Sequence, residues 1–168
     1  MTREERVAHF EGILDRALLA AEQVETARET YEAAKEACEA AQEAYEASKR
    51  ACEADQSSYG ATLDACDAAR AAYRASQGAC EAAQAACAMA QKAREVNQEA
   101  VKDLERYYTG PEWKEDYAAD EAGLFPADFK RGVLSQDAVY DLLERWDELS
   151  EIPAKELPPR MEGSITIL

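Results

Sequence analysis

The chain is poor in the residue types from which globular cores and active sites are usually built. Its 168 residues include three Phe, two Trp, one His, seven Gly and five Pro. His9 is the only histidine and no glycine-rich phosphate loop is present, so we find neither a nucleophile–histidine pairing nor a nucleotide-binding motif. The scarcity of Phe and Trp, with Ala filling most apolar positions, argues against a broad globular core, because burying Ala removes little apolar surface from water.

The chain also lacks positive charge and long apolar runs. It has 19 basic and 35 acidic residues, a net charge of −16. Nucleic acids and anionic membranes require a basic face, so this balance argues against both as partners. No apolar run approaches the ~18–20 residues of a membrane span, and the opening MTREERVAHFEGILDRALLA is typical of an amphipathic helix rather than a secretory leader. We therefore expect a cytoplasmic protein whose five cysteines stay reduced.

What the chain does contain is a heptad pattern of small and apolar residues. Every seventh residue from Phe10 to Tyr108 falls on one helical stripe, with a polar break at Arg94, and a second stripe follows three residues later from Ile13 to Leu104. Two such stripes predict long coiled-coil helices. Ala fills most apolar positions and combines strong helix propensity with a small cross-section. The sequence thus predicts an all-α protein.

A 14-residue unit recurs within this pattern, over residues 31–100 approximately. It reads YEAAKEACEAAQEA, YEASKRACEADQSS, YGATLDACDAARAA and YRASQGACEAAQAA, and a degenerate copy, CAMAQKAREVNQEA, follows. A disordered acidic tract is a poor alternative, because the apolar phase is kept and Gly and Pro are almost absent. We interpret the repeat as a tandem enlargement within a shorter helical protein.

One interruption of the pattern leaves two architectures open. Ser57 and Ser58 followed by Gly60 predict a turn near Ser57–Gly60. Residues 3–56 and 61–108 would then form a long helical hairpin that buries its own stripe. The alternative is one continuous long helix, which would need a second chain to cover its apolar face. The unbroken heptad phase across Tyr59 supports that alternative, but we favour the hairpin.

The regular cysteines do not predict a metal site or disulfides. Cys38, Cys52, Cys66 and Cys80 are spaced fourteen residues apart, which is roughly 21 Å along a helix, whereas metal ligands converge within a few ångströms. Only pairing between two helices could bring two of these thiols together. We interpret the Cys and Tyr stripe as packing residues.

From Tyr107 the composition changes to that of a small helical module. Gly110 and Pro111 end the long helix, a short helix follows at 112–117 and is closed by Gly123, and Ser135 is a good N-cap for a last helix from Gln136 to about Ser150. We expect that helix to bury Val139, Tyr140, Leu142, Leu143, Trp146 and Leu149. The predicted organisation is therefore a coiled-coil region at 1–108, a C-terminal module at 109–150 and a loose tail at 151–168.

The segment YYTGPEWKEDYAADEAGLFPADFKRGVLSQDAVYDLL, from Tyr107 to Leu143, resembles a small bacterial family, domain of unknown function 4298. The matching positions are Tyr107, Tyr108, Trp113, Asp116, Asp120, Glu121, Gly123, Pro126, Asp128, the run Lys130 to Ser135, Asp137, Tyr140, Leu142 and Leu143. Residues 3–19 also resemble the family's N-terminal helix. The departures are Phe129, Gln136 and a much greater length. The resemblance implies an all-helical bacterial protein and names no activity or cofactor.

Two classes of function remain open for this module. Asp116, Asp120, Glu121 and Asp128, followed by Lys130 and Arg131, would be the material of an enzyme or metal-dependent site at Asp116–Arg131. Hard-metal binding needs about six converging oxygens, and this spacing lacks the loop of a calcium hand. We therefore favour a non-enzymatic structural or protein-interaction module without metal or cofactor.

Within the favoured class, aromatic and Arg residues are typical of interaction hot spots. The candidate partner-docking residues are Trp113, Tyr117, Lys130, Arg131 and Tyr140. The partner would be another protein or a second copy of the chain. A plainer interpretation is also open, in which the aromatic residues cap the helical pair while Lys130 and Arg131 pair with nearby acids.

Overall fold

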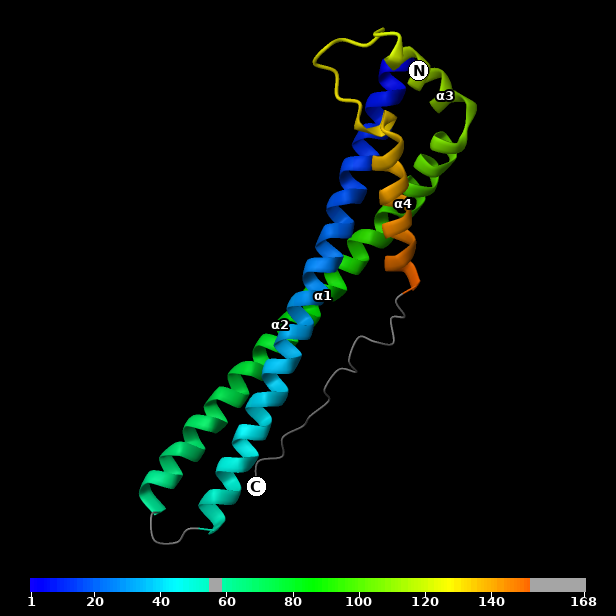
Figure 1. Ribbon diagram of the computed structural model, residues 1–168. Helices are drawn as coiled ribbons and strands as arrows, with labels where there is room; N and C mark the ends of the chain where they lie inside the picture. The colour runs from blue at the N-terminus through cyan, green and yellow to red at the C-terminus, as the bar shows by residue number, and fades with distance from the viewer. Residues whose placement is uncertain (55–58, 152–168) are drawn as a thin grey trace. The chain divides into compact units, whose positions relative to one another are not determined.

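The computed structural model describes the backbone of residues 1–54 and 59–151, and the side chains of residues 1–54 and 63–149. The elements in this range are all helical: α1 (Arg3–Ala54), α2 (Tyr59–Thr109), α3 (Pro111–Glu121), the short 3-10 helix η1 (Gly132–Leu134) and α4 (Gln136–Glu151) (Figure 1). No helix in this range combines the length and the apolar character that crossing a membrane requires.

The two long helices form an antiparallel hairpin, as predicted. The rings of Tyr45 in α1 and Tyr73 in α2 are stacked, and the Cys87 thiol donates a hydrogen bond to the Ala27 carbonyl. The predicted turn begins in residues 55–58, which lie outside the described residues. Its last two residues, Tyr59 and Gly60, belong to the first turn of α2. The predicted tail lies outside the described residues from position 152 onward.

The chain divides into two compact units. The terminal unit combines Met1–Val24 with Ala90–Leu168, and the hairpin unit consists of Glu25–Met89. The terminal unit therefore contains the start of α1 as well as the end of α2, α3, η1 and α4. The boundary expected at residue 108 follows a change in composition. The compact units instead follow contacts in space, so the start of α1 and the end of α2 join the C-terminal helices in one unit.

The heptad pattern explains which residues pack in the hairpin unit. The described members of its Tyr and Cys stripe are buried or half-buried, whereas the residues next to them, apart from the half-buried Ala86, are exposed. Tyr31, Cys66 and Cys87 are the most buried members, and Ala83 lies on the buried part of the second stripe. The Cys and Ala side chains at these positions are small, which favours a close approach of the two helices.

The ends of the helices in the terminal unit are fixed by local signals. At the start of α1, the Glu5 amide donates to Thr2 Oγ1 (3.2 Å) while Glu5 Oε2 accepts from the Thr2 amide (2.8 Å), which is a capping box. Between α2 and α3, a Cβ atom on Gly110 would lie 2.9 Å from the Arg106 carbonyl oxygen, so only Gly fits there. The α3 helix then begins directly with Pro111.

The core of the terminal unit is built from large side chains that the hairpin unit lacks. Its most buried members are Val7, Leu104, Val133, Val139, Leu142 and Trp146. The Ser135 hydroxyl accepts from the Ala138 amide (3.4 Å), as expected of the α4 N-cap. Tyr140 was expected inside but is 57% exposed. The buried stripe of α4 is narrower than predicted, and Tyr140 lies beyond its edge.

Candidate functional site

The most buried charged group in the terminal unit is the carboxylate of Asp116, on α3. Its side chain is 0% exposed. Arg6, on α1, donates from Nε to Oδ2 (2.8 Å) and from Nη2 to Oδ1 (2.6 Å), and the Tyr107 hydroxyl donates to Oδ2 (2.9 Å). Arg3 Nε lies 3.2 Å from Oδ1. A fully buried carboxylate is tolerated only with such partners, so this cluster joins α1, α2 and α3.

The electrostatics of the cluster follow from burial and from the carboxylate. Burial, and then the hydrogen bond to Asp116, raise the pKa of Tyr107 well above its usual range, so this hydroxyl remains a donor. The hydrogen bonds to Asp116 likewise raise the pKa of Arg6. The Tyr107 ring stacks on Phe10 with centroids 4.0 Å apart, which fixes the hydroxyl toward Asp116. The Asp116 carboxylate and the Arg6 guanidinium therefore both stay charged, and hydrogen bonds satisfy the buried carboxylate.

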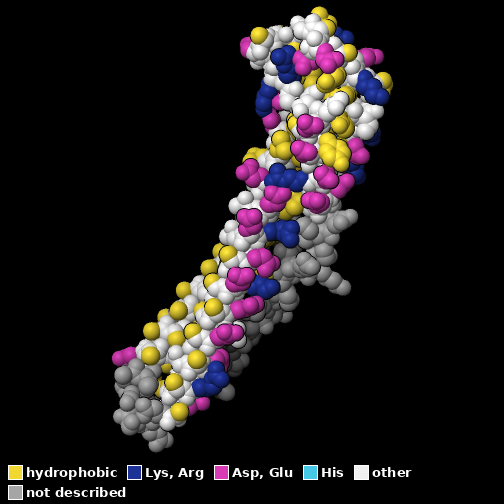
Figure 2. All heavy atoms as spheres, viewed as in Figure 1, with side chains coloured by type: hydrophobic (Ala, Val, Ile, Leu, Met, Phe, Trp, Pro, Cys, Tyr) yellow, Lys and Arg dark blue, Asp and Glu magenta, His cyan; other side chains and the backbone are white. Residues whose placement is uncertain are grey.

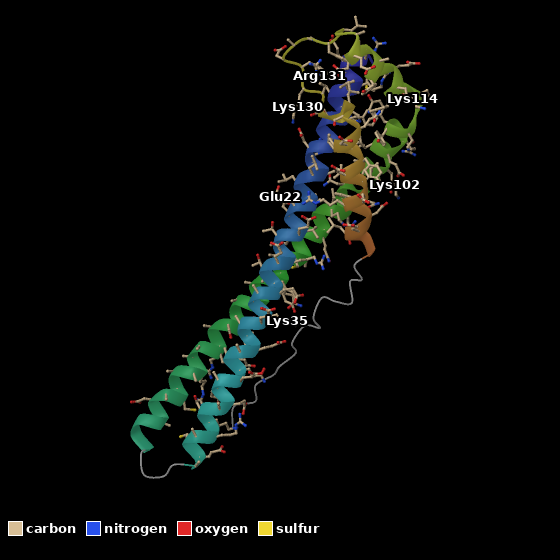
Figure 3. The ribbon with its side chains drawn as sticks, viewed as in Figure 1. Glu22, Lys35, Lys102, Lys114, Lys130 and Arg131 are labelled. Carbon is tan, nitrogen blue, oxygen red and sulfur yellow. The ribbon has the colours of Figure 1, made fainter. Side chains whose placement is uncertain are left out.

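A second polar junction joins α1 to the segment before α4. Glu11 is only 5% exposed, and its Oε2 accepts from the Val133 amide (2.6 Å). A Cβ atom on Gly132 would lie 3.0 Å from Glu11 Oε1, so the missing side chain makes room for this carboxylate. Lys130 lies 3.7 Å from Glu11 and donates to both oxygens of Asp15 (2.7 and 2.6 Å) (Figure 3).

The structure brings the predicted docking residues into one unit but gives several of them internal partners. Trp113 is buried, and its Nε1 donates to the Val133 carbonyl (2.9 Å). Arg131 donates to Asp120 Oδ1 (2.6 Å), and Lys130 pairs with α1 as described above. Tyr117 is half-buried and stacks on Trp113. Tyr140 is the most exposed aromatic residue of this group.

The four carboxylates considered for an enzyme or metal site are distributed over different environments. Asp116 is buried with Arg6, Asp120 pairs with Arg131, and Glu121 and Asp128 are exposed. Within residues 1–54 and 63–149, no three His, Cys, Asp or Glu side chains are grouped as metal ligands. What this arrangement does is hold helices together.

A second candidate surface lies on the hairpin unit. Thirteen Ala side chains that lie one residue before or two residues after a Tyr or Cys of the stripe are exposed: Ala33, Ala37, Ala40, Ala44, Ala47, Ala51 and Ala54 on α1, and Ala65, Ala68, Ala72, Ala75, Ala79 and Ala82 on α2. In an antiparallel pair these positions of both helices lie on the same side. We call this surface the alanine face.

The alanine face carries no charged side chain. In the described parts of the repeats, the acidic and basic residues occupy other heptad positions. Figure 2 shows hydrophobic side chains scattered over the visible face of the hairpin unit, while Asp, Glu, Lys and Arg gather along an edge. Met89, 68% exposed, continues the face on α2. The sequence carries the signal for this surface, since Ala recurs at fixed heptad positions beside the Tyr and Cys stripe.

Comparison with known proteins identifies a family but no characterised relative. Residues 76–152 match the family described as "Domain of unknown function (DUF4298)", which confirms the family resemblance drawn from the C-terminal motif. The match includes α3, η1, α4 and the part of α2 from residue 76 onward, and residues 1–75 and 153–168 lie outside it. No curated protein and no solved structure matches the chain.

Proposed function

We propose that this chain, whose residues 76–152 belong to the DUF4298 family, is a non-enzymatic structural protein that associates with a second copy through the alanine face. The observation that carries the proposal is the segregation of charge in the hairpin unit. An acidic chain with a net charge of −16 presents a surface on two helices where no charge occurs. Large uncharged, apolar surfaces of this kind are typical of interaction sites.

The size of the alanine face suits a second copy. The exposed Ala positions span 33–54 on α1 and 65–82 on α2. Two neighbouring helices over this length present a planar area of roughly 600 Å², near the ~800 Å² that each partner buries in a standard interface. Because the face carries no charged side chain, a second copy seated on it would bury no unpaired charge within the contact, and Ala allows its helices to come close.

In this proposal the terminal unit positions a separate docking surface for another protein. Of the predicted docking residues, Tyr140 is the one best placed for this role. It lies on the exposed side of α4 together with the acidic residues Asp137, Asp141 and Glu144. A large aromatic side chain surrounded by carboxylates fits a basic partner segment. We also place the protein in the bacterial cytoplasm, where its thiols would stay reduced.

The test of self-association uses two variants that add the same charge to different sides of the hairpin unit. Ala44→Glu with Ala72→Glu places two carboxylates on the alanine face, and Gln42→Glu with Gln77→Glu places them outside it. Sedimentation velocity should show a dimer for the wild type and the Gln variant and a monomer for the Ala variant, with equal helicity by circular dichroism. A monomeric wild type, or equal behaviour of both variants, would contradict the proposal.

A further inference from the structure

The register of the hairpin unit places cysteines opposite one another in two layers of the seam. The stacked rings of Tyr45 and Tyr73 fix one layer, with centroids 6.2 Å apart. The next layer toward the turn is reached by a step of seven residues forward in α1 and seven residues back in α2. This step places Cys52 opposite Cys66. The same step in the opposite direction from the Tyr45–Tyr73 layer places Cys38 opposite Cys80. The contact between Cys87 and the Ala27 carbonyl shows that the antiparallel pairing continues beyond that layer.

The four thiols share the environment of the seam. Cys66 is buried and Cys38, Cys52 and Cys80 are half-buried, and all four are free thiols. The Cys80 thiol has a raised pKa, mainly because of burial and in smaller part because of Cys38, so these two sulfur atoms are close enough to affect each other. The described second-stripe positions beside them carry Ala or Ser, so no bulky side chain stands at these positions: Ala34, Ala41, Ser48, Ala69, Ser76 and Ala83.

We propose that Cys38 with Cys80, and Cys52 with Cys66, are redox-sensitive pairs that form disulfide bonds between α1 and α2. The reduced pairs leave the helices joined by noncovalent contacts alone. Oxidation adds a covalent bond across the seam at either layer and locks the hairpin. This inference rests only on the register and burial within the hairpin unit and is independent of self-association.

The chemistry is thiol–disulfide exchange with a low-molecular-weight disulfide such as oxidised glutathione. The thiolate of one cysteine attacks the small disulfide, which forms a mixed disulfide and releases one small thiolate. The opposed thiolate then attacks the protein sulfur of the mixed disulfide, forms the Cys–Cys bond and releases the second small thiolate. The two protons of the cysteine thiols end on the two released thiols. The protein loses two electrons and the small disulfide gains them.

The test compares proteins that keep only two cysteines. A matched protein retains Cys38 and Cys80, and a mismatched protein retains Cys38 and Cys66, with Ser at the other three positions. Both are incubated with oxidised glutathione at mildly alkaline pH, where more of the thiols are ionised. Non-reducing electrophoresis and intact mass then measure the internal disulfide, seen as the loss of two hydrogens without added glutathione.

The matched protein should form the internal disulfide at least roughly tenfold faster than the mismatched one, because opposed thiols have a high effective concentration. Its melting temperature should rise on oxidation and return on reduction. A protein retaining only Cys52 and Cys66 should behave like the matched protein. Equal rates in matched and mismatched proteins, bonds only between separate chains, or an adduct that stops at the mixed disulfide would each overturn the proposal, and equal helicity of the reduced proteins shows that all of them fold.

Discussion

Arg6 donates two hydrogen bonds to Asp116, a residue 110 positions further along the chain. This pair fastens α3 to the first turns of α1, and the Tyr107 hydroxyl adds a bond from α2. Three helices of the terminal unit therefore depend on one buried carboxylate. Removing one member of a buried pair is costly, because the other charge and its neighbours are left without a partner.

Replacing Asp116 by Ala should lower the free energy of unfolding by about 3 kcal/mol. The matched control is Asp103→Ala, which removes the exposed pair between Asp103 and Arg106 and should cost less than ~1 kcal/mol. Urea denaturation followed by circular dichroism measures both. If the two variants were equally stable, the Asp116 cluster would not hold the helices together.

The buried Tyr107 hydroxyl predicts a loss of stability at alkaline pH. Its pKa is raised in the folded protein, whereas the unfolded value is about 10. The folded state therefore binds this proton more tightly, so its contribution is complete below pH ~10 and is lost as the pH rises through the folded pKa. Tyr107→Phe should make the unfolding free energy less dependent on pH above ~10 than it is in the wild type.

Absorbance titration checks the same assignment directly. Below the pH at which the wild type unfolds and below the folded pKa of Tyr107, the curves of the wild type and Tyr107→Phe should coincide, since the raised pKa keeps the Tyr107 hydroxyl protonated there. An ionising tyrosine that is present in the folded wild type and absent from the variant would show that Tyr107 is not held as a donor to Asp116.

Two glycines in α2 and at its end should respond oppositely to the same substitution. Gly78 has open space around the position of a Cβ atom, so Gly78→Ala should stabilise the helix by ~0.5–1 kcal/mol. Gly110→Ala would bring Cβ within 2.9 Å of the Arg106 carbonyl oxygen and 3.3 Å of the Tyr107 carbonyl oxygen, so it should destabilise the protein by more than that. Thermal unfolding of the two variants measures the difference in sign, and a lower melting temperature for Gly78→Ala would refute it.

The seam of the hairpin unit predicts a position-dependent response to added charge. Cys66 is 9% exposed, and Cys66→Glu would bury an unpaired carboxylate at a cost of several kcal/mol. Ala71, on the exposed side of the same helix, can be changed to Glu with an effect within ~0.5 kcal/mol. Equal melting temperatures of these two variants would mean that the Tyr and Cys stripe does not form the seam.

Short-range sequence patterns were enough to predict much of the fold, namely the long helices, their buried stripe and the end of α2. The heptad spacing predicted the stripe that contains Tyr31 and Cys66, and Gly110 with Pro111 marked the junction between α2 and α3. The capping box of Thr2 and Glu5 is likewise a local signal, because its two residues are three positions apart. Local signals work here because helix formation and helix ends depend on residues three to seven positions apart.

The candidate site could not be predicted in the same way. Nothing near Asp116 in the sequence points to Arg6 as its partner, because that pairing depends on how α1 and α3 pack. Lys130 likewise reaches Asp15 across a separation of 115 residues. Tyr140 fits a broad apolar stripe on α4, but Val139, Leu142 and Trp146 fill the space against the neighbouring helices, so Tyr140 remains outside. The long-range ion pairs and the width of the buried stripe of α4 depend on how the helices pack, and a local sequence pattern does not carry that information.

The most direct test of the account is the mass of the wild-type protein in solution as its concentration is varied. Sedimentation equilibrium should give twice the mass of the chain at the higher concentrations and a shift toward the single-chain mass on dilution, because a second copy covers the alanine face. High salt should leave the association intact, since the face carries no charge to be screened. A mass equal to one chain at every concentration would contradict the account.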